Sequence, residues 1–321
     1  MSFSANTKSE LARIFPEQHC CKLAELAALI RMSGTLHLTG LKKINLRINT
    51  ENPSTARKIF KYIKKLFEIH TEVMIRRNSR LKKNNYYMMM ISHGMGSVTI
   101  LKQVGILKED NNSFDITYEL PKELLTKHCC KRAYLRGAFL GGGSISAPEK
   151  TYHLEFVTNS LQHSEDLKNL INEFNLNAKT VERKGSYVVY IKEGDQVVDI
   201  LNIIGAHKAL LDLENIRVYK QMRNDINRIV NCETANLSKT VNASMRQIEN
   251  IEYIRDTVGI NALPEGLREI ADLRLNYQEA SLKELGQMIT PSIGKSGVNH
   301  RLRKIEEIAK RLQMKNQESF D

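Results

Sequence analysis

The hydrophobic positions between residues 22 and 104 follow first a helical period and then a strand period. Apolar residues recur at helical spacing from Lys22 to Met32, and Ser33-Gly34 ends this predicted helix. Alternation from Leu36 to Asn49 predicts a β-hairpin that turns near Thr39-Gly40. The rest of the segment predicts a helix over 52–67 with Pro53 in its first turn, strands over 72–76 and 86–91, and a helix over 96–104.

The segment from 131 to 203 repeats this order of elements. Gly141-Gly142-Gly143 ends its first predicted helix, and we expect a tight helix-to-strand turn with positive φ there. Each half follows the order helix, strand, strand, helix, strand, strand, helix, which is typical of an α+β unit with an antiparallel sheet. The predicted elements are a helix over 131–140, a strand over 152–157, a helix over 161–174, a hairpin of 178–182 with 187–192, and a helix over 195–203.

A short motif shows that the similarity between the halves is a duplication. His19-Cys20-Cys21-Lys22 recurs as His128-Cys129-Cys130-Lys131, 109 residues later, and the register of apolar and small residues then holds without a gap. A repeat of this length is too long for a solenoid unit and fits a duplicated small domain. We therefore predict a duplicated domain over 1–215, with repeats at about 3–107 and 128–205.

Beyond residue 205 the strand pattern stops and the chain becomes helical. We expect helices over 215–232 and 236–258, a turn at 259–263, and a helix from Pro264 to about Tyr277. The boundary between domains is predicted near 231–239, within this helical stretch. This divides the remainder into a connecting helix (216–235), a helical domain (236–315) and a disordered tail (316–321).

The segment from Ser281 to Met314 resembles a helix-turn-helix. Ser281 and Glu284 form a capping-box pattern at the start of a short helix, and a turn over 289–294 precedes a second helix. In the second helix one buried stripe is predicted, formed by Val298, Leu302, Ile305, Ala309 and Leu312. This leaves Ser296, Asn299, His300, Arg303 and Lys304 facing outward, with Lys295 and Arg301 at the flanks.

These outward residues are suited to the major groove of DNA. Asn and Arg pair bidentately with adenine and guanine, and Lys295, Arg301 and Lys304 would meet phosphates. The alternative is a bundle helix whose outer face is merely charged; the cap, the turn and the basic run together favour DNA binding.

Charge and cysteine content narrow the class of protein further. The net charge of +12 favours a polyanionic partner, and the basic surplus is concentrated over 57–83 and 281–315. The chain has neither an apolar run of transmembrane length nor an N-terminal signal-peptide pattern, so we expect a cytoplasmic protein. Its five cysteines suggest no disulfide framework.

The His-Cys-Cys pairs leave two readings open. If the helices that begin at these two motifs pack side by side, their histidine and cysteine side chains come close together. Zinc binds these side chains, so a metal site is one reading. Adjacent cysteines are poor chelators of one ion, however, because the usual spacing leaves two to four residues between them. The sequence therefore favours packing roles for Cys20, Cys21, Cys129 and Cys130, and predicts neither a metal site nor a cofactor.

Leu135-Arg-Gly-Ala-Phe-Leu-Gly-Gly-Gly143 resembles the LAGLIDADG motif of homing endonucleases, and Leu26 to Gly34 is a weaker copy. In that family two such helices pack closely, and each delivers one acidic residue for metal-dependent DNA cleavage. Ala28 and Gly137 would permit the close approach. The positions that should be acidic are Ser33 and Gly142, and neither supplies a carboxylate for a metal ion. The domain is therefore interpreted as a nuclease scaffold without catalytic residues.

Taken together, the chain resembles the WhiA family of bacterial DNA-binding regulators. The most specific stretches are Tyr134 to Ser144, Met222 to Thr240 and Ser296 to Lys304. The resemblance implies a degenerate LAGLIDADG-like domain joined to a C-terminal helix-turn-helix domain. It also implies roles in transcription, cell division, chromosome segregation and, in spore formers, sporulation.

The leading hypothesis is thus a non-enzymatic, sequence-specific protein that binds double-stranded DNA in association with the nucleoid. One alternative is an active endonuclease that uses other acids, such as Glu155. Another is an interaction hub whose first domain binds a second regulator and whose DNA contact is secondary. A second transcription regulator or RNA polymerase is the protein partner to expect beside double-stranded DNA. The oligomeric state is not predicted.

Overall fold

The structure is a computed structural model that describes residues 2–40, 43–77, 85–110 and 113–318. It divides into two compact units, Met1–Lys220 and Gln221–Asp321. Each unit has a hydrophobic core of its own, so the chain holds two separately packed bodies. No helix in the described ranges has both the length and the apolar character needed to cross a bilayer.

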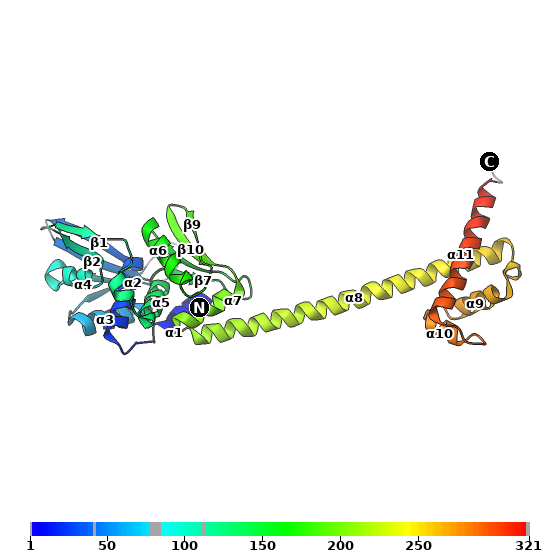
Figure 1. The fold of residues 1–321 in the computed structure, drawn as a ribbon, viewed down its shortest axis with the longest axis horizontal. Helices are drawn as coiled ribbons and strands as arrows, with labels where there is room; N and C mark the ends of the chain where they lie inside the picture. Colours follow the sequence, from blue (N-terminus) through cyan, green and yellow to red (C-terminus); the bar gives the residue numbers. More distant parts are fainter. Residues whose placement is uncertain (1, 41–42, 78–84, 111–112, 319–321) are drawn as a thin grey trace. The chain divides into compact units, whose positions relative to one another are not determined.

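The first repeat forms a four-stranded antiparallel sheet in the order β1-β2-β4-β3 (Figure 1). The predicted hairpin, formed by β1 and β2, is confirmed. Strand β2 lies inside the sheet and buries Ile44, Leu46 and Ile48. The repeat consists of α2 (His19–Ser33), β1 (Gly34–Gly40), β2 (Lys43–Thr50), α3 (Pro53–Phe67), β3 (Glu72–Arg77), β4 (Asn85–Ile91) and α4 (Ser97–Gln103). Residues 78–84, between β3 and β4, include the end of the basic segment 57–83 and lie outside the described residues.

The second repeat has the same topology, with the strand order β7-β8-β10-β9. The predicted α+β class and the duplication are therefore confirmed. Strand β7 is only three residues long, too short for alternation to reveal it in the sequence. The repeat consists of α5 (His128–Gly142), β7 (Gly143–Ile145), β8 (Leu154–Thr158), α6 (Leu161–Asn172), β9 (Lys179–Arg183), β10 (Ser186–Ile191) and α7 (Gly194–Ile204).

Two small elements outside the repeat pattern were not predicted. Helix α1 (Phe3–Leu11) precedes the first repeat, with Ser2 as its N-cap, and buries Leu11 in the shared core. The hairpin of β5 (Leu107–Asp110) and β6 (Ser113–Ile116) lies between the repeats. Both are short, and an element of so few residues carries little periodic signal.

Helices α2 and α5 pack side by side at the centre of the first unit (Figure 1). Their backbones approach closely at Gly137. A Cβ atom there would lie 2.2 Å from the carbonyl oxygen of Glu25 and 3.0 Å from Cβ of Ala28. The predicted use of small residues at this contact is confirmed, because only glycine fits against the backbone of the neighbouring helix.

The three glycines at the end of α5, Gly141 to Gly143, were predicted to be needed for a turn with positive φ, and the structure gives a different reason. Gly141 and Gly142 belong to the helix, and Gly143 is extended with φ of −82°. The predicted positive φ is therefore wrong. The glycines are required by close packing, since a Cβ on Gly141 would lie 2.7 Å from Cβ of Met32. A Cβ on Gly142 would lie 2.8 Å from the carbonyl oxygen of Val157.

A buried ionic network joins the two repeats and was not predicted from sequence. The Glu25 carboxylate, fully buried in α2, forms an ion pair with Lys58 of α3 and lies 3.2 Å from Nε of Arg136 in α5. It also accepts a hydrogen bond of 2.8 Å from the hydroxyl of Tyr62. Lys58 is completely buried, so this member of the basic 57–83 segment is not available to a surface partner.

A single helix, α8 (His207–Thr257), replaces the two helices predicted over 215–232 and 236–258. The predicted gap between those two helices, at 233–235, is therefore wrong. Residues 231–239 contain neither Gly nor Pro, and Asn, Ser and Thr lower helix propensity without ending a helix. The change from the first compact unit to the second, at Lys220, falls within this helix.

The last helix also extends further than predicted. Helix α11 (Lys295–Glu318) continues past Met314, so residues 316–318 are helical rather than disordered. The rest of the predicted tail, residues 319–321, lies outside the described residues.

Candidate nucleic-acid interface

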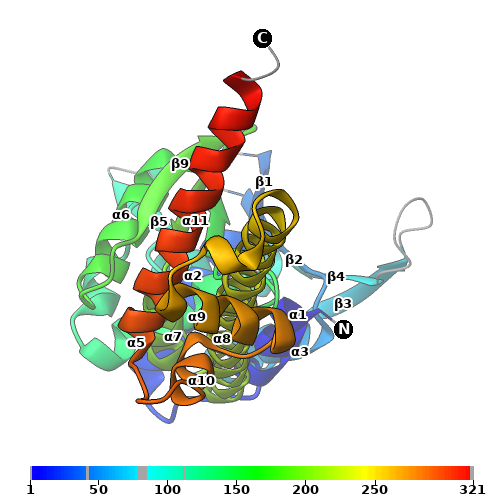
Figure 2. The same cartoon turned by 90° about the vertical axis from the view of Figure 1, so that its right-hand side faces the viewer.

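The second unit contains the predicted helix-turn-helix, formed by α10 (Leu282–Gln287) and α11. Helix α9 (Glu265–Asn276) precedes it, and all three helices are in view in Figure 2. The predicted stripe of α11 is buried at Val298, Leu302, Ile305 and Ala309, while Leu312 is partly buried. These side chains share one core with α8, α9 and α10, to which Ile251, Ile254, Leu267, Ile270 and Leu285 contribute. Burial of the stripe fixes which face of α11 is turned outward.

The start of α10 and the turn that follows it are held by local hydrogen bonds. Ser281 Oγ accepts a hydrogen bond from the Glu284 amide at 3.3 Å, and a Glu284 carboxylate oxygen accepts one from the Ser281 amide at 2.7 Å. The predicted capping box is confirmed. The bond from the Ser281 amide lowers the pKa of Glu284. The amide of Ile293 then donates to the Gly286 carbonyl at 3.0 Å, which closes the turn before α11.

The N-terminal half of α11 presents a polar, basic face. A shallow groove between the start of α10 and the start of α11 is lined by Leu282, Lys295, Ser296 and Asn299. Asn299 is half-buried at its edge. Five of the seven side chains predicted to contact DNA are exposed to solvent, namely Lys295, Ser296, His300, Arg303 and Lys304.

Arg301 differs from the other predicted interface residues, because it contacts α9. Its Nη1 donates to the carbonyl oxygen of Gly266 at 3.2 Å and lies 3.7 Å from a carboxylate oxygen of Glu269. Position 301 lies at the edge of the buried stripe, which explains why its side chain turns toward the neighbouring helix. The structure therefore gives Arg301 a role in holding α11 against α9.

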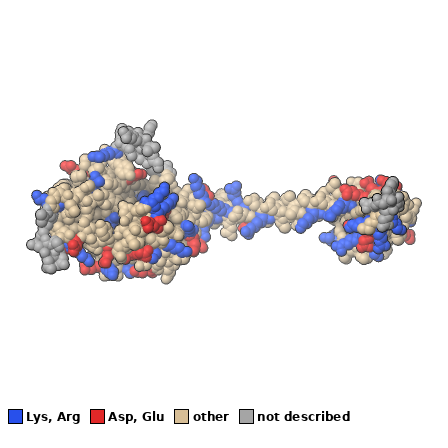
Figure 3. Space-filling model, turned by 90° about the horizontal axis from the view of Figure 1, so that it is seen from above, with Lys and Arg blue, Asp and Glu red and all other residues tan. Residues whose placement is uncertain are grey.

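The electrostatics of the segment 281–315 favour an anionic partner. Lys and Arg side chains gather on part of the surface of the second unit in Figure 3. The pKa of Glu306 is lowered, first by a hydrogen bond from Lys310 and then by the charges of Lys310, Arg246 and Arg303. The remaining basic side chains of α10 and α11, all exposed, are Lys283, Lys310, Arg311 and Lys315.

The two positions at which the LAGLIDADG motif carries acids, residues 33 and 142, hold no carboxylate in this chain. Ser33 ends α2, and its hydroxyl donates to the Leu29 carbonyl at 2.6 Å. Gly142 has no room for a side chain, as its contact with the Val157 carbonyl shows. The alternative acid, Glu155 on β8, is engaged by the hydroxyl of Ser144 at 2.9 Å and by the ring of His153 at 3.1 Å. The ends of α2 and α5 thus hold no pair of carboxylates.

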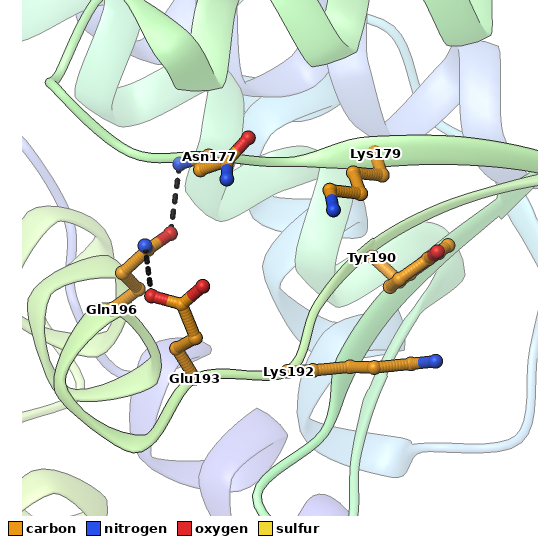
Figure 4. A pocket seen from close by; sticks show the side chains of 6 residues that line it. All are labelled: Asn177, Lys179, Tyr190, Lys192, Glu193 and Gln196. Carbon is orange, nitrogen blue, oxygen red and sulfur yellow. Dashed lines mark hydrogen bonds between the residues drawn. The ribbon is translucent and has the colours of Figure 1, made fainter.

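A second surface hollow lies on the second repeat, beside β9, β10 and the start of α7 (Figure 4). Gln196 closes one side of it, accepting from the Asn177 amide at 2.7 Å and donating to Glu193 at 2.5 Å. Lys179 and Lys192 line the other side, and Lys192 Nζ lies 4.8 Å from the centre of the Tyr190 ring. Asn177, Gln196 and Glu193 bond to one another and the hollow is small, so this site does not favour catalysis.

Comparison with known proteins identifies the family. Three family models match, described as the WhiA N-terminal LAGLIDADG-like domain (residues 19–107), the WhiA LAGLIDADG-like domain (131–223) and the WhiA C-terminal HTH domain (226–309). The "Probable cell division protein WhiA" of Alkaliphilus metalliredigens is 70% identical over 97% of this chain and 98% of its own. The chain belongs to the WhiA family. The protein of the same name from Alkaliphilus oremlandii is 69% identical over 98% of each chain.

Solved structures place this WhiA-family chain in the same fold. The crystal structure of full-length WhiA from Thermatoga maritima matches with a TM-score of 0.57 and 25% identity, over 97% of this chain and 99% of that one. The N-terminal LAGLIDADG domain of a WhiA protein matches with a TM-score of 0.50 and 19% identity, over 64% of this chain and 90% of that one. The predicted family and the predicted combination of LAGLIDADG-like and helix-turn-helix domains are confirmed.

Proposed function

We propose that this WhiA-family protein binds double-stranded DNA in a sequence-specific manner, without cleaving it, and acts as a transcription regulator. The observation that carries the proposal is the outward face of α11. Its exposed polar and basic side chains stand at the N-terminal end of a helix whose opposite face is buried. A recognition helix uses this end to contact base edges in the major groove.

The residues divide by the chemistry they offer to DNA. Asn299 and Arg303 carry side chains that pair bidentately with adenine and guanine, so they are assigned to base recognition. Lys295 and Lys304 are assigned to phosphates, which attract an ammonium group without regard to sequence. Ser296 and His300 lie on the same face and complete the contact surface. DNA recognition is thereby assigned to the helical domain of residues 236–315.

The absence of cleavage is supported by residues 33 and 142, where the LAGLIDADG motif carries acids. Metal-dependent hydrolysis of a phosphodiester requires carboxylates that hold the metal ions. Ser33 offers a hydroxyl that is already bonded to the Leu29 carbonyl, and Gly142 offers no side chain. A degenerate scaffold of this kind serves binding or assembly rather than catalysis.

The relatives suggest the biological setting. Proteins that are 70% and 69% identical to this chain are named as probable cell division proteins. We extend that role to this chain as control of genes for cell division, with chromosome segregation and sporulation as related processes. Such a protein would work on the nucleoid in the cytoplasm, where a second transcription regulator or RNA polymerase is a natural partner.

The test begins by selecting bound sequences from a random pool of DNA duplexes with the full-length protein. Binding of the selected duplex and of an unrelated duplex is then measured at fixed salt for Asn299→Ala and Arg303→Ala. Each change should weaken specific binding by about 5- to 150-fold, equivalent to about 1–3 kcal/mol, and relax the preference for one base. Lys304→Ala should weaken the binding of both duplexes to the same extent. It should also reduce the slope of log affinity against log salt concentration by about one, since one phosphate contact is lost.

Arg311→Ala is the matched control, because Arg311 is exposed on the same helix but lies two turns beyond Arg303. It should reduce specific binding much less than Arg303→Ala does. Specific binding that survives both Asn299→Ala and Arg303→Ala would show that α11 is not the recognition helix. The non-catalytic assignment would be refuted if the unaltered protein cleaved either duplex in the presence of Mg²⁺ or Mn²⁺ and substitution of one of its Asp or Glu residues abolished the cleavage.

A further inference from the structure

Three cysteines from the two repeats meet at the starts of α2 and α5, and Cys129 joins them through Gln18. Cys21 Sγ and Cys130 Sγ are 3.8 Å apart, although 109 residues separate them in the chain. The Sγ atoms of Cys20, Cys21 and Cys130 all lie within 4.8 Å of one another. Among the described residues this is the one cluster of three or more His, Cys, Asp or Glu side chains with such spacing. The packing of α2 against α5 therefore brings the two pairs of adjacent cysteines together as one thiol cluster.

The fourth cysteine and Gln18 complete the arrangement. Three thiols donate to the same side-chain oxygen of Gln18, with sulfur-to-oxygen distances of 3.7 Å for Cys20, 3.6 Å for Cys21 and 3.4 Å for Cys129. One oxygen atom thus has three sulfur atoms around it, with Cys130 beside them.

The spacing of the sulfur atoms of Cys20, Cys21 and Cys130 is close to that of a tetrahedral thiolate site, and Cys129 must move toward them to become the fourth ligand. A zinc–sulfur bond of about 2.3 Å places the sulfur atoms of a tetrahedral site about 3.8 Å apart. The Cys21–Cys130 distance already has this value, and the third sulfur needs only a small movement to reach it. Oxygen and nitrogen ligands are not required, so a thiophilic ion is favoured over Mg²⁺ or Ca²⁺.

We infer that Cys20, Cys21, Cys129 and Cys130 bind one Zn²⁺ ion, which links the first repeat to the second. Each helix contributes two ligands, and Gln18 leaves the centre of the cluster when the ion enters. Cys129 is exposed and Cys20 is half-buried, so the ion has a route from solvent. The site lies outside the proposed DNA interface and does not include residues 33 and 142.

The sequence favoured packing roles for these cysteines because adjacent cysteines are poor chelators of one ion. Here, however, the close approach of α2 and α5 supplies the second pair. The two histidines of the repeated motif take no part in the cluster. His19 is exposed, and the ring of His128 lies against Phe174, with centroids 4.9 Å apart.

The test uses the reduced, full-length protein after metal removal with a chelator and exchange into chelator-free buffer. It is titrated with Co²⁺, whose tetrahedral thiolate complexes have a charge-transfer band in the near ultraviolet and d–d bands in the visible range. We expect saturation at one Co²⁺ per chain, followed by loss of both bands when Zn²⁺ displaces Co²⁺.

Substitutions separate this site from adventitious binding. Cys129→Ser and Cys20→Ser change side chains that are not fully buried, and each should weaken Zn²⁺ binding by at least about 100-fold, because loss of outer-shell partners alone costs 10- to 100-fold. Cys232→Ser, the same change at an exposed cysteine of the second unit, should leave binding unaltered. Circular dichroism at the start of each titration shows that the variants are folded.

Three results would overturn the inference. The first is the absence of thiolate–cobalt bands in the folded, reduced protein. The second is a Co²⁺ affinity that Cys129→Ser and Cys20→Ser leave unchanged. The third is an equal loss of affinity in Cys232→Ser. DNA binding through α11 is measured separately, so failure of the metal site leaves the proposed function standing, and the reverse also holds.

Discussion

His163 makes the stability of the first unit sensitive to acid. The side chain is 3% exposed at the first turn of α6, where its two ring nitrogens lie 3.0 Å from the hydroxyl of Tyr134 and 3.1 Å from Oγ1 of Thr158. The imidazole thus ties α6 to α5 and β8. Burial, with a smaller contribution from the charge of Arg31, lowers the pKa of His163 to about 3.

The sign of the effect follows from the two protonation states. In the unfolded chain His163 titrates near its ordinary pKa of 6.5, whereas in the folded protein it stays neutral down to about pH 3. Between these values the unfolded state binds a proton that the folded state does not. The contribution of His163 to the free energy of unfolding is therefore fully present above pH 6.5 and is lost as the solution is acidified. The difference of about 3.5 pH units, at about 1.4 kcal/mol per unit, amounts to about 5 kcal/mol by pH 3. About 2 kcal/mol of this is lost by pH 5.

The assay is urea denaturation of the full-length protein at pH 7 and at pH 5, for the wild type and for His163→Gln. Near-ultraviolet circular dichroism of tyrosine reports mainly on the first unit, which holds nine of the eleven tyrosines. Glutamine is neutral at both pH values, so the variant should lose about 2 kcal/mol less than the wild type between them.

The control is His70→Gln, the same change at an exposed histidine between α3 and β3. It should retain the wild-type dependence on pH. Equal losses of stability in the wild type and His163→Gln between pH 7 and pH 5 would refute the reasoning, because His163 would then not be the buried group that resists protonation.

Three further predictions follow from the packing. Gly142→Asp should not create nuclease activity, tested with Mg²⁺ and duplex DNA, and should lower the free energy of unfolding by about 1–3 kcal/mol, because its Cβ would lie 2.8 Å from the Val157 carbonyl. Gly137→Ala should cost about 3 kcal/mol or more in chemical denaturation, since its Cβ would lie 2.2 Å from a backbone oxygen of α2. Arg301→Ala should lower the free energy of unfolding of the second unit by about 1 kcal/mol, because its contacts with α9 are lost. Arg303→Ala should reduce DNA binding and leave the melting temperature unchanged, since its side chain is exposed. Differential scanning calorimetry measures both melting temperatures.

Local pattern in the sequence was sufficient for most elements of the two repeats, for their order and for the buried face of α11. Alternation and helical spacing record which side of an element is buried, so the buried stripe from Val298 to Ala309 could be located without coordinates. The repeated His-Cys-Cys-Lys motif likewise revealed the duplication. The missing acids at Ser33 and Gly142 are visible at once, because the resemblance fixes which positions should carry them.

The tertiary structure decided the features that depend on contacts between distant segments. The Glu25–Lys58–Arg136 network joins three helices, and no single window of sequence pairs its charges. Arg301 was predicted as a phosphate contact, but packing of α9 beside α11 directs it to Gly266. The continuity of α8 was missed because weak helix propensity resembles a break when residues are read in isolation.

The thiol cluster shows the same division most clearly. The sequence by itself determined that each repeat begins its central helix with two cysteines. Only the close packing of α2 against α5 brings Cys21 and Cys130 to 3.8 Å. The physical reason is that local pattern encodes which face of a helix avoids water, whereas the distance between two faces is set by the side chains of both helices together.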